Sequence, residues 1–220
     1  VKKSYSPGLY DLTELQREAN QRFGYSAKET LNIMQRLYEN HKVLTYPRTD
    51  SRYLSKDIVP TIKDRLEACG TGPYRKLAMT AKKKDLSGKL AFVNDAKVSD
   101  HHAIIPTEQF VDLSHMTNEE RKIYDLVVRR FLAVLYPPFE YEQTQVTVKV
   151  GGETFLASGK IVKAQGWRAA YEEEVYSAED EEEEEAYESG KSLKGQTLPE
   201  LEKGQEIKGL VLSLTEGKTK

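Results

Sequence analysis

The sequence predicts an α+β fold, in which a mostly helical part with a helix-turn-helix-like core is followed by a β-rich part. Helix-capping residues followed by apolar residues at helical spacing recur up to about residue 136. After Pro137-Pro138 the pattern changes to the alternation that is typical of strands. The 220 residues are enough for one large domain or two small ones, and no apolar run approaches the ~20 residues of a membrane span.

Two helices separated by a tight turn are predicted near the beginning of the chain. Thr13 and Gln16 have the spacing of a capping box, and Gly24 is suited to end the helix that they begin. Ser26 and Glu29 have the same spacing and predict a second, longer helix. Its apolar residues recur at helical spacing and are expected in the core: Leu31, Met34, Leu37 and Tyr38.

Further helices are predicted in the middle of the chain. Ser55 begins a segment that we expect to be helical, with Pro60 starting or kinking it. Residues 70–90 are predicted to form a loop, and the basic run Lys82–Lys84 within it is either solvated or a phosphate contact. A third capping box, Thr117 with Glu120, begins a long helix with one apolar stripe: Ile123, Leu126, Val127, Phe131, Val134 and Leu135.

A β-hairpin is predicted after these helices. Residues 146–150 alternate between valine and polar residues, Gly151-Gly152 provides a turn, and "ETFLASGKIV" predicts the second strand. "EIKGLVLSL", near the end of the chain, alternates again as a strand. Residues 172–188 contain 11 acidic residues and no basic ones, and we expect a solvated or disordered loop rather than a metal site, because spaced apolar residues that would hold ligands are missing.

The net charge of −2 is unevenly distributed. Residues 1–84 carry 17 Lys and Arg against 9 Asp and Glu, whereas residues 85–220 carry 16 against 26. A basic half favours an anionic partner, most commonly nucleic acid, although these residues can also merely solubilise helices. The single cysteine, Cys69, and the lack of an apolar leader-like stretch predict a reducing cytoplasm. Because the sequence starts at Val1 rather than Met, we expect a piece of a longer protein.

The stretch "LTYPRTDSRYLS", residues 44–55, allows two interpretations. Pro, Asp and Ser are turn formers, so this segment can be a simple turn with a tyrosine packed beside it. Alternatively it is a phosphate site in which the Tyr46 phenol is the nucleophile. In an extended loop Tyr46 and Arg48 would face one pocket, and Thr49, Ser51 and backbone N–H groups could complete a phosphate cradle.

A second polar stretch, "SDHHAIIPT", places two histidines before an apolar run. Such a histidine can bind a phosphate or relay a proton, or it can be an ordinary structural histidine. The chain shows no zinc-finger or EF-hand spacing, no P-loop and no dinucleotide motif.

Taken together, these stretches resemble type IA DNA topoisomerases, and most closely the bacterial topoisomerase III branch. The resemblance includes "LTYPRTDSRYLS", "LYDLTELQREANQRFGYSAKETLNIMQRLYE" and "DHHAIIPT" and extends through "GKIVKAQGWRAAY", so that it covers most of the chain. It implies an isomerase that cleaves and religates one DNA strand through a 5′-phosphotyrosine intermediate and passes a strand through the break without ATP.

The resemblance also implies roles for individual residues. Tyr46 would be the nucleophile, Arg48 would bind the scissile phosphate and His101 would assist there. The chain departs from the usual family pattern at His102, where the family has Glu, and at Ile105, where it has Arg. Seven further residues would bind DNA or support the site: Gln35, Glu39, Thr45, Thr49, Asp50, Ser51 and Arg52.

The resemblance further implies a division of the chain: a segment of a β-rich arch in residues 1–9, a helical domain with the active-site tyrosine in 10–136, and β-rich arch in 137–220. The family binds Mg²⁺ through an Asp-x-Asp motif in a Toprim domain, and this chain has no such motif. We therefore expect Mg²⁺ in the full-length enzyme, no metal site in this chain and no activity of the chain alone. The implied partners are single-stranded DNA and the remaining domains of the same polypeptide, at a cytoplasmic, nucleoid-associated location with no membrane. Other protein partners are unknown.

Two rival functions remain at this point. A site-specific tyrosine recombinase would have several spaced Arg and His residues and a tyrosine near its C-terminus, whereas Tyr46 comes early. A non-catalytic module that binds single-stranded nucleic acid would need only the helix-turn-helix outline. Covalently trapped DNA and the polarity of the linkage distinguish these functions.

Overall fold

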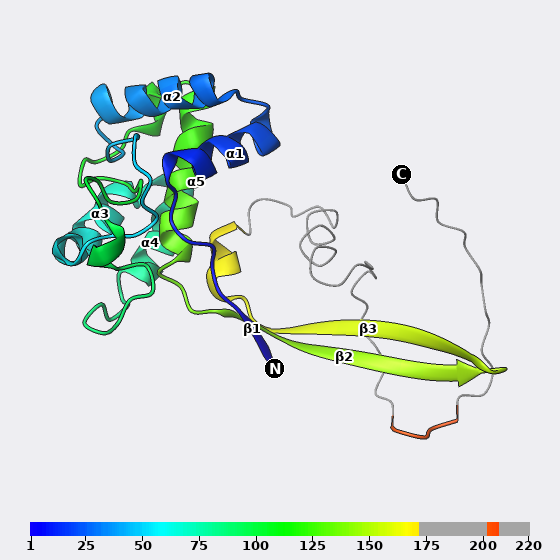
Figure 1. Ribbon diagram of the computed structural model, residues 1–220. Coiled ribbons are helices and arrows are strands. Elements are labelled where there is room, and N and C mark those ends of the chain that lie inside the picture. Colours follow the sequence, from blue (N-terminus) through cyan, green and yellow to red (C-terminus); the bar gives the residue numbers. More distant parts are fainter. Residues whose placement is uncertain (172–201, 207–220) are drawn as a thin grey trace.

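The structure, a computed structural model, describes residues 1–171 and 202–206. The helices gather in one body, and a long β-hairpin extends away from it (Figure 1). The predicted α+β class is therefore confirmed. Within the described residues, no helix combines the length and apolar character that crossing a membrane requires.

The first two helices begin at polar caps. α1 (Leu12–Phe23) is capped by Asp11, whose carboxylate accepts a hydrogen bond from the Glu14 N–H at 2.7 Å, so the predicted start at Thr13 is wrong. Aspartate ranks above threonine as a cap, so the capping-box spacing of Thr13 and Gln16 was the misleading signal. Gly24 ends α1 at φ 72°, as predicted. The capping box predicted at Ser26 is present and begins α2 (Ala27–Glu39).

Short helices follow the long loop. Pro60 lies in a 3₁₀ helix, η1 (Lys56–Thr61), which leads into α3 (Ile62–Cys69). The predicted loop at 70–90 is partly wrong, because it contains η2 (Gly72–Tyr74) and α4 (Arg75–Ala81). A helix this short is marginal by itself, and α4 depends on packing against α3 and α5. Two further 3₁₀ turns are η3 (Asp95–Lys97) and η4 (Leu113–His115).

The long helix α5 (Asn118–Ala133) lies at the centre of the helical body (Figure 1). It begins at the predicted capping box of Thr117 and Glu120. All six residues of the predicted stripe are buried, and Val128, Leu132 and Arg130 on other faces are buried as well. From residue 126 to residue 133 α5 is buried on all sides. This follows from its neighbours, because α1, α2, α4 and η5 (Gly166–Tyr171) all contact α5.

The predicted hairpin is present as β2 (Phe139–Val150) and β3 (Glu153–Ala164), joined through two glycines with positive φ. A third strand, β1 (Lys2–Ser4), pairs antiparallel with the beginning of β2, so the sheet order is β1-β2-β3. Trp167 ties this sheet to the helical body, because its Nε1–H donates to the Ser4 carbonyl at 3.0 Å. The acidic segment 172–188 and residues 207–214 of the last predicted strand lie outside the described residues.

Candidate active site

The loop that follows α2 runs in an extended conformation through Tyr46. Burial alternates along it: Pro47, Thr49 and Ser51 are buried, whereas Arg48 is exposed and Tyr46 is half-buried. This alternation is typical of an extended chain with one face on a core. Tyr46 and Arg48 thus both reach solvent, on either side of the buried Pro47.

A second segment, residues 101–107, holds this loop in place. Leu44 and Pro106 form an antiparallel bridge. Thr45 bonds Ile105 in both directions, with its N–H donating to the Ile105 carbonyl and its Oγ1 accepting from the Ile105 N–H, both at 3.0 Å. The two polar stretches that the sequence singled out are therefore neighbours in space.

This pairing brings Tyr46 and His101 together. Their ring centroids are 4.3 Å apart, with the ring planes inclined at 37°. The His101 side chain is exposed, and its carbonyl is fixed by the Thr49 hydroxyl, which donates to it at 2.9 Å. The imidazole of an exposed histidine beside a half-buried phenol is available to a ligand that approaches from solvent.

Thr49 and Ser51 use their hydroxyl groups inside the protein. Thr49 Oγ1 also accepts from the Ser51 N–H at 3.1 Å. Ser51 Oγ donates to the Lys97 carbonyl at 2.7 Å and accepts from the Tyr53 N–H at 3.1 Å. Two roles were predicted for Thr49 and Ser51: supporting the site, or binding the phosphate directly. These contacts agree better with the supporting role, because both hydroxyl groups are used inside the protein.

Tyr38 lies on the other side of Tyr46, with the two rings edge to face and their centroids 5.5 Å apart. The prediction that Tyr38 belongs to the core is wrong, because it is 38% exposed. The last turn itself stays in the core, since its Leu37 is fully buried, but the buried residues of α2 form a face to one side of Tyr38. An open pocket of about 590 Å³ lies here and is lined by seven residues: Tyr38, Glu39, Lys42, Leu44, Thr45, Tyr46 and Thr107.

The remaining predicted residues differ in their surroundings. The exposed Arg48 guanidinium makes no hydrogen bond or ion pair within the described part of the chain. Asp50 is exposed and accepts a hydrogen bond from Ser99 Oγ at 3.3 Å. Gln35 is partly buried on α2, one turn before Glu39. Burial lowers the pKa of His102, whose Nδ1 lies 2.7 Å from the Ala103 carbonyl oxygen, so the neutral imidazole is favoured.

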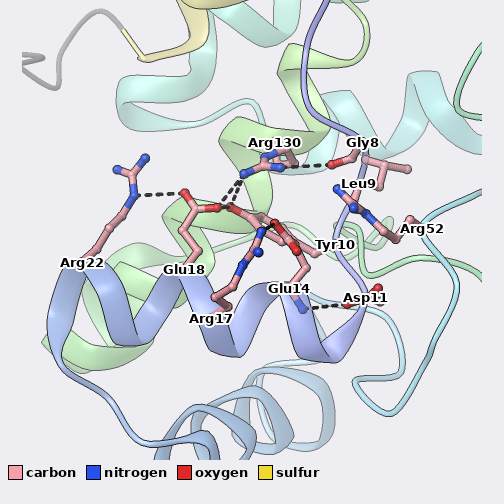
Figure 2. Close-up of polar contacts among 10 residues, drawn as sticks. All are labelled: Gly8, Leu9, Tyr10, Asp11, Glu14, Arg17, Glu18, Arg22, Arg52 and Arg130. Atoms are coloured by element: carbon pink, nitrogen blue, oxygen red, sulfur yellow. Dashed lines mark hydrogen bonds and ion pairs between the residues drawn. The ribbon is translucent and has the colours of Figure 1, made fainter. Parts of the chain in front are cut away.

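Arg52 links the active-site loop to the segment that enters α1. Its Nε–H donates to the Leu9 carbonyl at 3.1 Å. The adjacent Gly8 carbonyl accepts from Arg130 Nη1 at 3.2 Å, and Arg130 Nη2 pairs with Glu18 at 2.5 Å (Figure 2). The buried Tyr10 hydroxyl also donates to Glu18. Sequence reasoning missed this buried cluster, since nothing in the spacing of residues 10, 18 and 130 brings them together.

The residues that the structure describes contain no candidate metal site. No three or more of their His, Cys, Asp or Glu side chains form a cluster that could hold an ion. The groups gathered around Tyr46 are instead one histidine, one free arginine and the open pocket. Such an arrangement suits an anionic ligand on a phenol.

A family described as DNA topoisomerase matches the whole chain, residues 1–220. The chain is 58% identical over 219 residues to DNA topoisomerase 3 of Bacillus thuringiensis (strain Al Hakam), and 55% identical over 220 residues to DNA topoisomerase 3 of Bacillus subtilis (strain 168). Each match covers 100% of this chain and 29% of the relative.

A likeness of fold is found among solved structures as well. Full-length topoisomerase I from Thermotoga maritima matches with a TM-score of 0.59 over 91% of this chain and 30% of that chain. The sequence identity is 23%, so this match supports the fold alone.

Proposed function

Because this chain belongs to the DNA topoisomerase family and is 55–58% identical to bacterial DNA topoisomerase 3 proteins, we propose that it is the strand-cleaving part of a type IA enzyme. The chain spans 29% of the length of its curated relatives, so the activity of the whole protein is part of the proposal. The substrate is a single-stranded segment of DNA, and the reaction opens and rejoins that strand to change DNA topology.

In the proposed reaction the Tyr46 phenol oxygen attacks the phosphorus of a phosphodiester. The phenol loses its proton as its oxygen bonds to the 5′-phosphate, the P–O3′ bond breaks, and the leaving oxygen takes up a proton to become a 3′-hydroxyl. The phosphotyrosine ester retains the energy of the broken diester. Attack by the 3′-hydroxyl therefore reverses the step and rejoins the strand without ATP.

The contact of the Tyr46 and His101 rings at 4.3 Å is the observation that supports this reaction best. A phenol is a weak nucleophile at neutral pH, so the site must stabilise the negative charge that develops on the phosphate. His101 can donate a hydrogen bond to that phosphate. The exposed Arg48 guanidinium, two residues along the loop and without a partner in the described chain, can bind two of its oxygens.

The test uses the full-length protein and a single-stranded oligonucleotide labelled at either end. After denaturation in detergent, the 3′-labelled fragment is expected to remain on the protein, whereas the 5′-labelled fragment is released. Tyr46→Phe, which removes only the phenol oxygen, is expected to abolish the adduct and to leave DNA binding nearly unchanged. Retention of the 5′ label would indicate a recombinase-type linkage, and no adduct with either label would favour a non-catalytic binding module.

The proposed division of the chain is residues 1–9 and 137–220 as arch and residues 10–136 as the tyrosine domain. The pairing of β1 with β2 supports this division, since it joins the first residues to the hairpin rather than to the helices. Mg²⁺ would be held by residues outside this chain, at an Asp-x-Asp motif, and the described residues offer no cluster that fits it. The proposed location is the bacterial cytoplasm at the nucleoid, with the other domains of the same polypeptide as partners.

A further inference from the structure

The connection between β1 and α1 touches both stretches that carry the candidate catalytic groups. We call residues 8–12 the connecting segment. The Tyr10 carbonyl accepts from the N–H of Ile104, in the histidine-containing stretch, at 2.9 Å, and the two residues form an antiparallel bridge. The Leu12 N–H donates to the carbonyl of Thr49, in the active-site loop, at 3.0 Å. The connecting segment therefore lies against both stretches and can set their relative position.

Two arginines from different elements hold the beginning of the connecting segment (Figure 2). Arg52, in the active-site loop, donates through Nε to the Leu9 carbonyl at 3.1 Å. Arg130, in α5, donates through Nη1 to the Gly8 carbonyl at 3.2 Å. The carbonyl groups of three successive residues thus accept from α5, from the active-site loop and from the histidine-containing stretch. Such a segment cannot shift without breaking contacts to all three elements.

Arg130 is itself fixed in a buried cluster. The residue is only 6% exposed, and its Nη2 donates to the Glu18 carboxylate at 2.5 Å and to the Tyr10 hydroxyl at 3.0 Å. Its guanidinium also lies over the Tyr10 ring, 4.3 Å from the ring centroid. Packing and hydrogen bonds lock the rotamer of such a side chain. The Gly8 carbonyl is therefore held by a rigid group.

We propose that Arg130 and Arg52 are positioning residues for strand cleavage, which hold the connecting segment and, through it, the Tyr46 loop against the histidine-containing stretch. The inference rests on the proposed function, since it takes Tyr46 to be the nucleophile. In this role neither arginine touches the reacting atoms. Arg52 thereby supports the site rather than binding a DNA phosphate, and Arg130 acts on the site from outside both stretches.

Single-turnover cleavage by the full-length protein separates positioning from DNA binding. Arg52→Met removes the donor and keeps a side chain of similar length. Adduct formation at saturating single-stranded DNA is expected to slow by up to about 100-fold, which a misplacement of ~1 Å can cause. The affinity, measured in a Tyr46→Phe background to prevent cleavage, should change far less. Arg52→Lys, which can still donate to the Leu9 carbonyl, should recover most of the rate.

Salt dependence distinguishes positioning from a phosphate contact of Arg52. Loss of one phosphate contact on a single strand reduces the slope of log K against log salt by about 0.7. Arg48→Met, which removes the exposed guanidinium proposed to bind the phosphate, should show this reduction. Arg52→Met should keep the slope of the parent protein. A reduced slope or an unchanged cleavage rate in Arg52→Met would overturn the positioning role of Arg52.

The neighbouring arginine of α5 provides a matched control for Arg130. Arg129 is also 6% exposed and pairs with Asp125 at 2.9 Å, but it donates to the Ala170 carbonyl and not to the connecting segment. Arg129→Lys and Arg130→Lys keep the charge beside each carboxylate and lose the forked contacts of the guanidinium. At a temperature where both variants are folded, only Arg130→Lys should slow adduct formation. Equal rates in the two variants would overturn the role of Arg130.

A double variant tests whether Arg52 acts through the histidine. In a His101→Ala background, Arg52→Met has less positioning to lose. The combined slowing should therefore be smaller than the product of the two single effects. A combined slowing equal to that product would overturn the inference, while the covalent adduct of the wild-type protein still upheld the proposed function. A wild-type protein that forms no adduct would overturn the function itself.

Discussion

Replacing Thr49 by Val tests whether buried hydroxyl groups position the active site. Valine has nearly the same shape as threonine but cannot donate to the His101 carbonyl or accept from the Ser51 N–H, which the hydroxyl does at 2.9 and 3.1 Å. Ser51 is only 4% exposed, so its N–H has no access to water. A buried unpaired donor costs roughly 1–3 kcal/mol, and the exposed His101 segment can recover part of its own loss from solvent.

The expected loss of unfolding free energy is therefore about 2–4 kcal/mol, which corresponds to a fall in Tm of roughly 5–15 °C for a protein of this size. Urea unfolding followed by circular dichroism measures it. Thr80→Val is a matched control, because Thr80 is exposed and its hydroxyl donates only within α4, to the Lys76 carbonyl at 3.0 Å. That change should stay within about 0.5 kcal/mol.

Thr49→Val has a second, functional readout in the full-length protein. Because His101 loses one of its anchors beside Tyr46, the rate of covalent adduct formation should fall more than the affinity for single-stranded DNA. Thr49→Ser, which keeps the oxygen, should restore most of both stability and rate. If Thr49→Val unfolds like the wild type and cleaves at the same rate, the reasoning that these hydroxyls position the site is refuted.

Three further perturbations give distinct expected outcomes. Arg48→Ala should raise the barrier to cleavage by ~2–4 kcal/mol and leave Tm unchanged, because the guanidinium is exposed and unpaired within the described residues. Single-turnover rates measure the barrier and a melting curve measures Tm. A lower Tm would contradict the view that Arg48 has no structural role. Gly166→Ala should lower the free energy of unfolding in urea by about 3 kcal/mol or more, because φ is +52° and a Cβ would lie 2.2 Å from the Pro138 carbonyl oxygen. An almost unchanged free energy of unfolding would disprove the clash. For Glu120, burial raises the pKa but the hydrogen bond from Arg36 and its other partners outweigh this, so the pKa is lowered. Its stabilisation is present above about pH 4.5 and is lost as the pH falls through the lowered folded-state pKa. Glu120→Gln should lower the stability at pH 7 and flatten this part of the curve of stability against pH.

The predictions that depended on neighbouring residues in the chain were mostly confirmed. The capping boxes at Ser26 and Thr117 and the hairpin turn at Gly151-Gly152 are decided by local hydrogen bonds and backbone torsions, which a few adjacent residues specify. The start of α1 was predicted wrongly at Thr13 because only its capping-box spacing was considered, whereas Asp11, a better cap type two residues earlier, caps the helix.

Long-range packing decided what these local signals left open. The helix α4 was missed because seven residues are too few to be helical by themselves, and contacts with α3 and α5 stabilise it. Tyr38 was wrongly assigned to the core because the apolar spacing left open which side of α2 faces the core, and the buried face, which includes Leu37, lies to one side of Tyr38. The pairing of Arg130 with Glu18 joins residues that are far apart in the sequence, so no spacing rule contains it.

For the candidate site, the sequence by itself determined the chemical groups: a phenol, a guanidinium and a histidine in two short stretches, together with a strong resemblance to one family. Only the tertiary structure decided that the stretches meet, that the rings of Tyr46 and His101 lie 4.3 Å apart, and that Arg48 and Lys42 are left without partners in the described chain. The physical reason is that residue type is local, whereas distance and burial depend on how segments far apart in the sequence pack around α5.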